Sequence, residues 1–217
     1  TAPIWNGIPE LFLKSSVTAN NLKKDYDYYV WLNDDSILFK NAFSVIYNDL
    51  NDKKSSIILG TFISSNQNLN EITYGGRDKH LTLLKPSGEP QECSLINGNF
   101  VFIPKEVFKK VGFLSKMFTH NYGDTDYGLR AIKKKFKVFI ASEVVGICNK
   151  NEIELWRRPN TRFFSRLKSF YKSKNFIITE VMYFQLIHFG FFAFLKHFIG
   201  VFLIIFSPKI YYKLSKF

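Results

Sequence analysis

The chain has 217 residues, a length that suits one domain or one domain with an appendage, and its hydrophobic content of 46% is ample for a core. Two cysteines, Cys93 and Cys148, exclude a disulfide framework, so we expect free thiols in a reducing compartment. The net charge of +12 is uneven, since residues 150–217 hold 12 Lys and Arg against 3 Asp and Glu. We therefore expect a near-neutral body over residues 1–150 and a basic, aromatic-rich helical tail over residues 151–217.

The first third of the chain alternates between expected helices and strands. We expect a helix over residues 9–24 and a second, amphipathic helix over residues 39–50, whose apolar residues recur at spacings of three and four. Residues 26–32, between them, have strand character. Residues 56–63 form a near-continuous apolar run, which favours a strand in a sheet that is covered on both faces.

The middle and later parts of the chain hold shorter predicted elements. Residues 81–84 and 92–95 are candidate strands on either side of a turn, and residues 100–103 form a strand that Pro104 ends. Pro104 also opens a short helix, which Gly112 closes. The remaining predicted elements are a helix from Gly123 through Lys133 and strands at 138–141 and 144–148.

Two adjacent acids, Asp34 and Asp35, directly follow the strand expected over residues 26–32. A strand that crosses a core places such residues at its carboxyl end, where open α/β sheets bind ligands. Carboxylates there could hold a divalent cation against a diphosphate, because hard cations prefer oxygen ligands. The alternative is a loop in which Asp34, Asp35 or Ser36 caps the helix that begins near Phe39.

A second acidic pair, Asp124 and Asp126, stands at the start of a predicted helix. Both could simply cap that helix, where Asp is favoured by hydrogen bonding and by the helix dipole. If Asp124 faces a cleft, it could instead accept a proton from an incoming hydroxyl group. Arg130 lies four residues after Asp126, so an ion pair between them is geometrically allowed, and such pairs are more often structural than catalytic.

Five segments, in order over residues 5–150, together resemble the family 2 glycosyltransferases and, within them, the rhamnosyltransferase-like branch. The segments are Trp5-Asn6-Gly7, Tyr28-Tyr29-Val30-Trp31-Leu32-Asn33-Asp34-Asp35-Ser36, Tyr74-Gly75-Gly76, Ile96-Asn97-Gly98-Asn99-Phe100-Val101-Phe102-Ile103-Pro104 and His120-Asn121-Tyr122-Gly123-Asp124-Thr125-Asp126-Tyr127-Gly128-Leu129-Arg130-Ala131. The resemblance implies an α/β fold of the GT-A type, a Rossmann-like mixed sheet flanked by helices, to which the tail adds a helical appendage. It also implies a UDP- or dTDP-sugar donor, Mg²⁺ or Mn²⁺, and inversion at the anomeric carbon.

The resemblance also assigns roles on the donor side of the site. Asn33-Asp34-Asp35 falls on the DXD position of the family, with Asn33 in place of the first acid. Asp35 would be the metal ligand, and Asp34 would contact the ribose or the diphosphate of the donor. Asn6 and Gly7 would bind the donor as well.

On the acceptor side, Asp124 falls on the position of the catalytic acid and would be the general base. Asn97 and Asn99 could hydrogen-bond sugar hydroxyls, although their loop could also be a plain turn. The residues expected to bind the acceptor are Asn97, Gly98, Asn99, Asp126, Arg130, Gly75 and Gly76.

The chain departs from the family at its beginning. The family starts with a strand–helix–strand unit that holds the nucleotide base, and this chain starts after it. We therefore expect a fragment that binds a nucleotide sugar poorly by itself, with a degenerate enzyme as the alternative. Ile8 and Pro9 stand where the family usually has Gly and Met, so the donor-side loop is expected to differ.

The tail allows three interpretations. Residues 156–174 interleave Arg and Lys with aromatic residues, and residues 177–206 are almost wholly apolar, with Glu180, Gln185, His188, Lys196 and His197 as polar breaks. This stretch could span a membrane, lie in the interface with its cations on anionic headgroups, or pack as a helical subdomain over the sheet. No recognition motif for nucleic acid accompanies it, so we expect no nucleic-acid partner.

The expected function is transfer of a sugar from a nucleotide-diphosphate donor to a hydroxyl group of a glycan or lipid-linked acceptor. We expect a peripheral enzyme of polysaccharide biosynthesis in the cell envelope, on the cytoplasmic face of a bacterial inner membrane. The alternative is a non-catalytic, truncated paralogue that binds glycans or a membrane complex.

Overall fold

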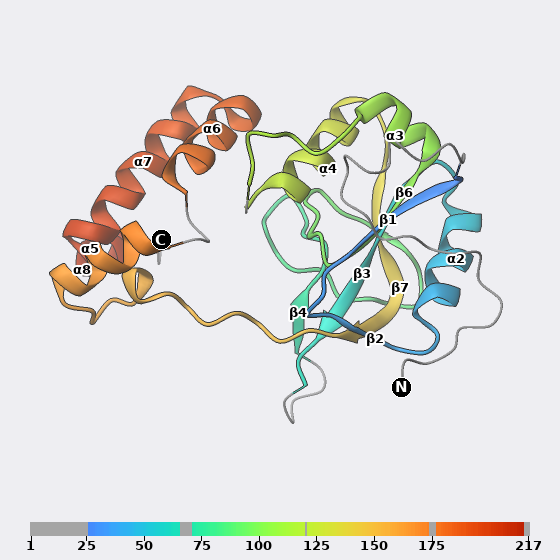
Figure 1. Cartoon of the computed structure of the whole chain (residues 1–217), viewed down its shortest axis with the longest axis horizontal. Helices are drawn as coiled ribbons and strands as arrows, with labels where there is room; N and C mark the ends of the chain where they lie inside the picture. Colours follow the sequence, from blue (N-terminus) through green and yellow to red (C-terminus); the bar gives the residue numbers. More distant parts are fainter. Residues whose placement is uncertain (1–25, 66–70, 120, 174–176, 215–217) are drawn as a thin grey trace. The chain divides into compact units, whose positions relative to one another are not determined.

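The computed structural model describes residues 26–65, 71–119, 121–173 and 177–214, which belong to two compact units (Figure 1). The first unit holds the described residues up to Phe113 together with Tyr127–Asn149. The second unit holds the described residues of Leu114–Asp126 and those from Lys150 onward. The helix expected over residues 9–24 lies outside the described residues, and the domain boundary expected near residue 150 stays a prediction.

The first unit is built on a mixed sheet, which has seven strands within the described residues. The parallel pair is β3 with β7, and the other paired strands are antiparallel. As a result, the carboxyl ends of β1, β3 and β7 lie at the same edge as the amino end of β6. In spatial order the main strands are β1 (Tyr28–Leu32), β6 (Phe100–Pro104), β3 (Ile57–Ile63), β7 (Val138–Ile147) and β2 (Ile37–Leu38), with β4 (Ile72–Tyr74) on β3 and β5 (Gln91–Glu92) on β7.

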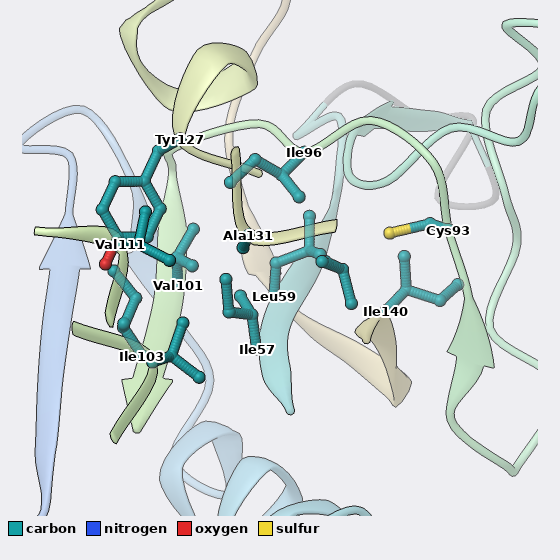
Figure 2. Close-up of a cluster of buried hydrophobic side chains, with 12 residues drawn as sticks. Ile57, Leu59, Cys93, Ile96, Val101, Ile103, Val111, Tyr127, Ala131 and Ile140 are labelled. Carbon is teal, nitrogen blue, oxygen red and sulfur yellow. The ribbon is translucent and has the colours of Figure 1, made fainter. Parts of the chain in front are cut away.

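Helices cover both faces of this sheet. Ile57 and Leu59 of β3 point to the face covered by α3 (Lys105–Val111) and by Tyr127 and Ala131 of α4 (Gly123–Lys133), as Figure 2 shows for this core. Ile58 of β3 points to the opposite face, where α2 (Ala42–Asp52) packs. This alternation explains the continuous apolar run in β3 and confirms the predicted fold class, a mixed sheet flanked by helices.

The strand predicted over residues 81–84 is wrong. Asp78 Oδ1 accepts hydrogen bonds from the N–H groups of His80 and Thr82, each at 2.8 Å, and these bonds form a turn. Leu81, between them, has a φ of 67°, which is incompatible with an extended strand. An isolated bridge between Arg77 and Leu83 is the β-pairing that the structure gives this segment.

The two strands predicted at 138–141 and 144–148 are one continuous strand, β7. The pairing of β3 with β7 shifts register beside Leu59 and Thr61. This irregularity accommodates the polar residues in the middle of β7 without ending the strand. There the Ser142 N–H donates a hydrogen bond of 2.8 Å to Oδ2 of the buried Asp49, so the acceptor for this N–H lies on α2. The short strands β2 and β4 were not predicted, because two or three residues show no alternation to read.

The second unit contains the helical tail. Its core gathers Trp156, Val181, Val201, Ile204 and Ile205. Its elements are the 3₁₀ helix η1 (Leu155–Arg157) and the helices α5 (Phe163–Lys172), α6 (Ile178–Phe189), α7 (Phe191–Phe206) and α8 (Pro208–Leu214). Within the described ranges, no helix combines the length and the apolar character needed to cross a bilayer.

Hydrogen bonds of Thr119 and a ring contact of Tyr122 connect this part of the chain to α6. Glu180 Oε1 accepts hydrogen bonds from the N–H of Thr119 at 3.0 Å and from its Oγ1 at 2.5 Å. The rings of Tyr122 and Phe184 are tilted by 33° and have centroids 4.4 Å apart. These contacts explain why this segment belongs to the same unit as the tail.

Candidate functional site

The acids Asp34 and Asp35 lie in an exposed turn between β1 and β2, at the carboxyl end of β1. The turn closes with a hydrogen bond of 3.3 Å from the Ser36 N–H to the Asn33 carbonyl oxygen. Helix α2 begins only at Ala42, after the N-cap residue Asn41. The alternative that these acids cap a helix is therefore wrong. Both carboxylates stand at the carboxyl end of β1, the position at which open α/β sheets in general bind ligands.

Asn99, which is 4% exposed, holds this turn from the loop before β6. Its Oδ1 accepts a hydrogen bond from Asn33 Nδ2 at 3.1 Å, and its carbonyl oxygen accepts one from the Asn33 N–H at 2.9 Å. Its Nδ2 donates to Ser36 Oγ at 3.4 Å and to Cys148 Sγ at 3.2 Å. Asn97 Oδ1 in turn accepts the Asn99 N–H at 3.3 Å. Asn99 thus connects the strand ends of β1, β6 and β7.

The ends of β3 and β7 join the same edge through Asn149. Its Oδ1 accepts hydrogen bonds from the Ser65 N–H at 2.9 Å and from Ser64 Oγ at 3.2 Å. Beside it, burial raises the pKa of the Cys148 thiol, and the negative charge of Asp35 raises it further. Because Cys148 therefore stays a neutral thiol, it contributes packing and a hydrogen bond to the site rather than a charge.

The oxygen donors at this edge are suited to a hard cation. Asp34 and Asp35 supply adjacent carboxylates, and Mg²⁺ is commonly held by one or two carboxylates together with substrate phosphates. In the part of the chain that the structure describes, no three His, Cys, Asp or Glu side chains gather into a metal site of their own. The residues present thus fit a divalent cation whose coordination a diphosphate completes.

The other sequence-predicted residues of the first unit lie in different surroundings. Asn97 and Gly98 are half-buried in the loop before β6, beside the turn that Asn99 holds. Gly75 and Gly76 are buried after β4, where a Cβ on Gly76 would lie 2.6 Å from Ile140 Cγ2. This close approach gives Gly76 a packing role. Asn6 and Gly7 lie outside the described residues.

Arg130 is placed in the first unit by its own contacts. Its Nη1 donates to the Val111 carbonyl oxygen at 2.9 Å, and its Nη2 donates to the Phe113 carbonyl oxygen at 2.8 Å. Its guanidinium also lies 5.2 Å from the ring centroid of Tyr127. Arg130 therefore satisfies carbonyl groups at the end of α3 that the helix itself leaves open.

Asp124 and Asp126 belong to the second unit, in the first turn of α4. Asp124 Oδ1 accepts a hydrogen bond from the Thr125 N–H at 2.6 Å, and its side chain is half-buried. Asp126 Oδ1 lies 2.8 Å from His188 Nε2, and both side chains are 2% exposed. Asp126 is thus a buried group with a specific partner on α6.

The sequence analysis did not pair His188 with Asp126. His188 did carry a signal, because it interrupts an otherwise apolar helix, and a buried polar residue needs a partner.

No model of a known protein family matches this chain, and neither does any curated protein. The solved structures that are similar to this chain include A197 from STIV and GalNAc-T7. A197 from STIV is 15% identical, with a TM-score of 0.40 over 64% of this chain and 76% of that chain. GalNAc-T7, solved with UDP, GalNAc and Mn²⁺, is 14% identical, with a TM-score of 0.48 over 88% of this chain. The chain spans 44% of the length of GalNAc-T7, a glycosyltransferase of the GT-A fold.

Proposed function

We propose that this protein is a glycosyltransferase, which moves a sugar from a UDP- or dTDP-linked donor to a hydroxyl group of a glycan or lipid-linked acceptor. The observation that carries the proposal is the convergence of strand ends on the turn of Asp34 and Asp35, with Asn99 buried behind it. Assignment to family 2 and its rhamnosyltransferase-like branch is part of the proposal and rests on the five sequence segments. A location at the cytoplasmic face of an inner membrane is also part of the proposal.

In this proposal the donor side is the edge formed by β1, β3 and β7. Asp35 holds a divalent cation, and Asp34 orients the ribose or the diphosphate of the donor. When bound, such a cation neutralises the negative charge that grows on the departing nucleoside diphosphate. Asn33 takes the role of a positioning residue, because its amide is already hydrogen-bonded to Asn99.

The acceptor side centres on Asp124, which acts as the general base. Its carboxylate takes the proton of the acceptor hydroxyl while that oxygen attacks the anomeric carbon from the face opposite the leaving group, which inverts the configuration. The five sequence segments also assign Asn97, Gly98, Asp126 and Arg130 to acceptor binding.

A second candidate is a non-catalytic module that binds glycans or a membrane complex. It is favoured by the hydrogen bond between Asp124 Oδ1 and the Thr125 N–H, which is a structural use of the proposed base. The two candidates differ in whether sugar is released from the donor and in whether that release requires Asp124.

The test is release of nucleoside diphosphate by the full-length protein from UDP- and dTDP-sugars with Mn²⁺, in the presence of membrane lipid extract as acceptor. We expect Asp124→Asn to lower turnover about 10²–10⁴-fold while the affinity for UDP changes less than about twofold. We expect Asp35→Asn to weaken metal-dependent binding of UDP at least about tenfold.

Asp52→Asn is the matched control, because Asp52 is an exposed acid at the end of α2, and it should behave as wild type. If Asp124→Asn leaves the release of nucleoside diphosphate unchanged, the mechanism is rejected. Binding of UDP without any release would favour the non-catalytic module.

A further inference from the structure

Helix α7 is largely apolar, and its buried residues lie on one side. Val201, Ile204 and Ile205 lie in the core of the second unit, against Trp156. The opposite side repeats apolar residues at spacings of three and four and is exposed, up to 85% at Phe192. We call this side the α7 apolar face, and it consists of Phe191, Phe192, Leu195, Phe198, Ile199, Phe202 and Phe206.

The α7 apolar face continues onto the neighbouring helix of the same unit. Phe202 and Phe206 have ring centroids 4.5 Å apart, and Phe206 lies 5.7 Å from Phe163 of α5. Phe163 in turn lies 5.4 Å from Phe164, which is 81% exposed. These rings form one connected aromatic surface. A connected patch of this kind on a folded protein marks an interaction site.

The charges around this surface have one sign. From Leu155 to the end of the chain the sequence has a single acid, Glu180, and its side chain is buried in the second unit. Exposed cations accompany the α7 apolar face in the same unit, with Lys196 on α7 itself and Lys209 and Lys213 on the next helix, α8. The surface therefore combines apolar rings with cations and carries no exposed acid in the described residues of α5–α8.

A cationic cavity of about 580 Å³ reaches this surface at Phe206. Arg166, which is 4% exposed, and Lys209 both line it. The Arg166 guanidinium donates to the carbonyl oxygens of Thr161 at 2.5 Å and Ile205 at 3.2 Å, and it makes no ion pair with any described residue. Its positive charge is thus balanced by dipoles alone, which favours an anion nearby.

These features distinguish between two kinds of partner. A second copy of this chain, docked face to face, would place the same cations opposite each other and bring no acid to compensate them. An anionic bilayer offers the complementary arrangement, because phosphate groups lie directly above an apolar interior. Helices that lie flat in that interface carry aromatic residues on one side and Lys or Arg beside them.

We propose that the α7 apolar face docks on the surface of an anionic lipid bilayer, with Lys196, Lys209 and Lys213 against the phosphate groups. The axis of α7 lies in the plane of the membrane, and Phe192 and Phe202 enter the boundary between headgroups and acyl chains. The docking does not depend on the proposed sugar transfer, so it is tested without donor or metal.

The test is co-sedimentation of the whole chain with vesicles of phosphatidylcholine, with and without about one third phosphatidylglycerol. We expect binding to the anionic vesicles, and a loss of about tenfold or more in partitioning for the double variant Phe192→Ser/Phe202→Ser. The double variant Lys196→Gln/Lys209→Gln should bind the anionic vesicles about five- to tenfold more weakly and leave binding to neutral vesicles unchanged.

Tyr47→Ser/Leu81→Ser is the matched control, because both residues are about as exposed but lie in the first unit. It should bind as wild type does, and all variants should keep the helical circular dichroism of the wild type. Absence of binding to anionic vesicles, or binding that Phe192→Ser/Phe202→Ser leaves intact, would overturn the proposal. A stable dimer in light scattering that this same variant converts to monomers would overturn it too, by assigning the face to a second copy.

Discussion

His188 Nε2 lies 2.8 Å from Asp126 Oδ1, and the two side chains are each 2% exposed. The contact joins α6 to the first turn of α4, two residues after Asp124. A buried carboxylate beside a specific imidazole is costly to separate, because either group alone would lose a charge-assisted hydrogen bond away from water. The pair thereby holds the first turn of α4 in place.

His188→Ala should destabilise the second unit by roughly 2–4 kcal/mol, because it removes this buried partner of Asp126. Combined with Asp126→Asn in a double-mutant cycle, it should show a coupling energy of about 1–3 kcal/mol. The measurement is urea unfolding followed by the fluorescence of Trp156, which lies in the core of this unit. Gln185→Ala on the same helix is the control. Purely additive effects would contradict the interpretation.

Asn99→Ala should lower the free energy of unfolding by about 1–3 kcal/mol, because it leaves Asn33, Ser36 and Cys148 without their common partner. It should also loosen the turn of Asp34 and Asp35. Hydrogen exchange of the turn amides measures the second effect. Asn51→Ala, at an exposed site on α2, should change stability by less than about 0.5 kcal/mol.

Two glycines should respond in opposite directions to the same substitution. Gly76→Ala places a Cβ 2.6 Å from Ile140 Cγ2 and 2.7 Å from Cys93 Sγ, so we expect a loss of about 1–3 kcal/mol. Gly200→Ala, inside α7, meets its first neighbour at 3.6 Å, so better helix propensity should add about 0.5–1 kcal/mol. Thermal unfolding of both variants measures these two changes in stability. Equal shifts would show that local space does not govern these sites.

Burial raises the pKa of Cys93 to about 12, with a smaller contribution from Glu92. Because the folded pKa lies above the ordinary value of 9.0, the thiol stabilises the fold fully below pH 9.0, and this contribution is lost as the pH rises towards 12. Alkylation by iodoacetamide at pH 9, followed by mass spectrometry, should leave Cys93 unmodified in the folded protein. In urea it should react within minutes. Rapid labelling in the folded state would contradict the burial.

Mn²⁺ should bind the protein more tightly in the presence of UDP than in its absence, because the exposed acids Asp34 and Asp35 supply only part of a coordination shell. Titration calorimetry with and without UDP measures the difference, which we expect to be at least about tenfold. Chelation with EDTA should leave the thermal midpoint unchanged. A lower midpoint in EDTA would indicate a structural metal instead.

The long apolar elements could be predicted from the sequence. Ile57–Ile63 is a near-continuous apolar run and Ala42–Asp52 has a helical period, and they appear as the expected strand and helix. The segment around Leu81 was misjudged because Asp78 forms a turn through its own side chain, which an apolar run does not reveal. The predicted roles of Asp34, Asp35 and Asp124 stay predictions.

The sequence by itself determined where β1 ends and which acids follow it, because apolar patterning and local turn chemistry depend on near neighbours in the chain. Only the tertiary structure decided which distant side chains meet. Asn99 reaches Cys148 over 49 positions, and Asp126 reaches His188 over 62. Such pairs follow from strand order and helix packing, which depend on the whole core and leave no periodic trace at either residue.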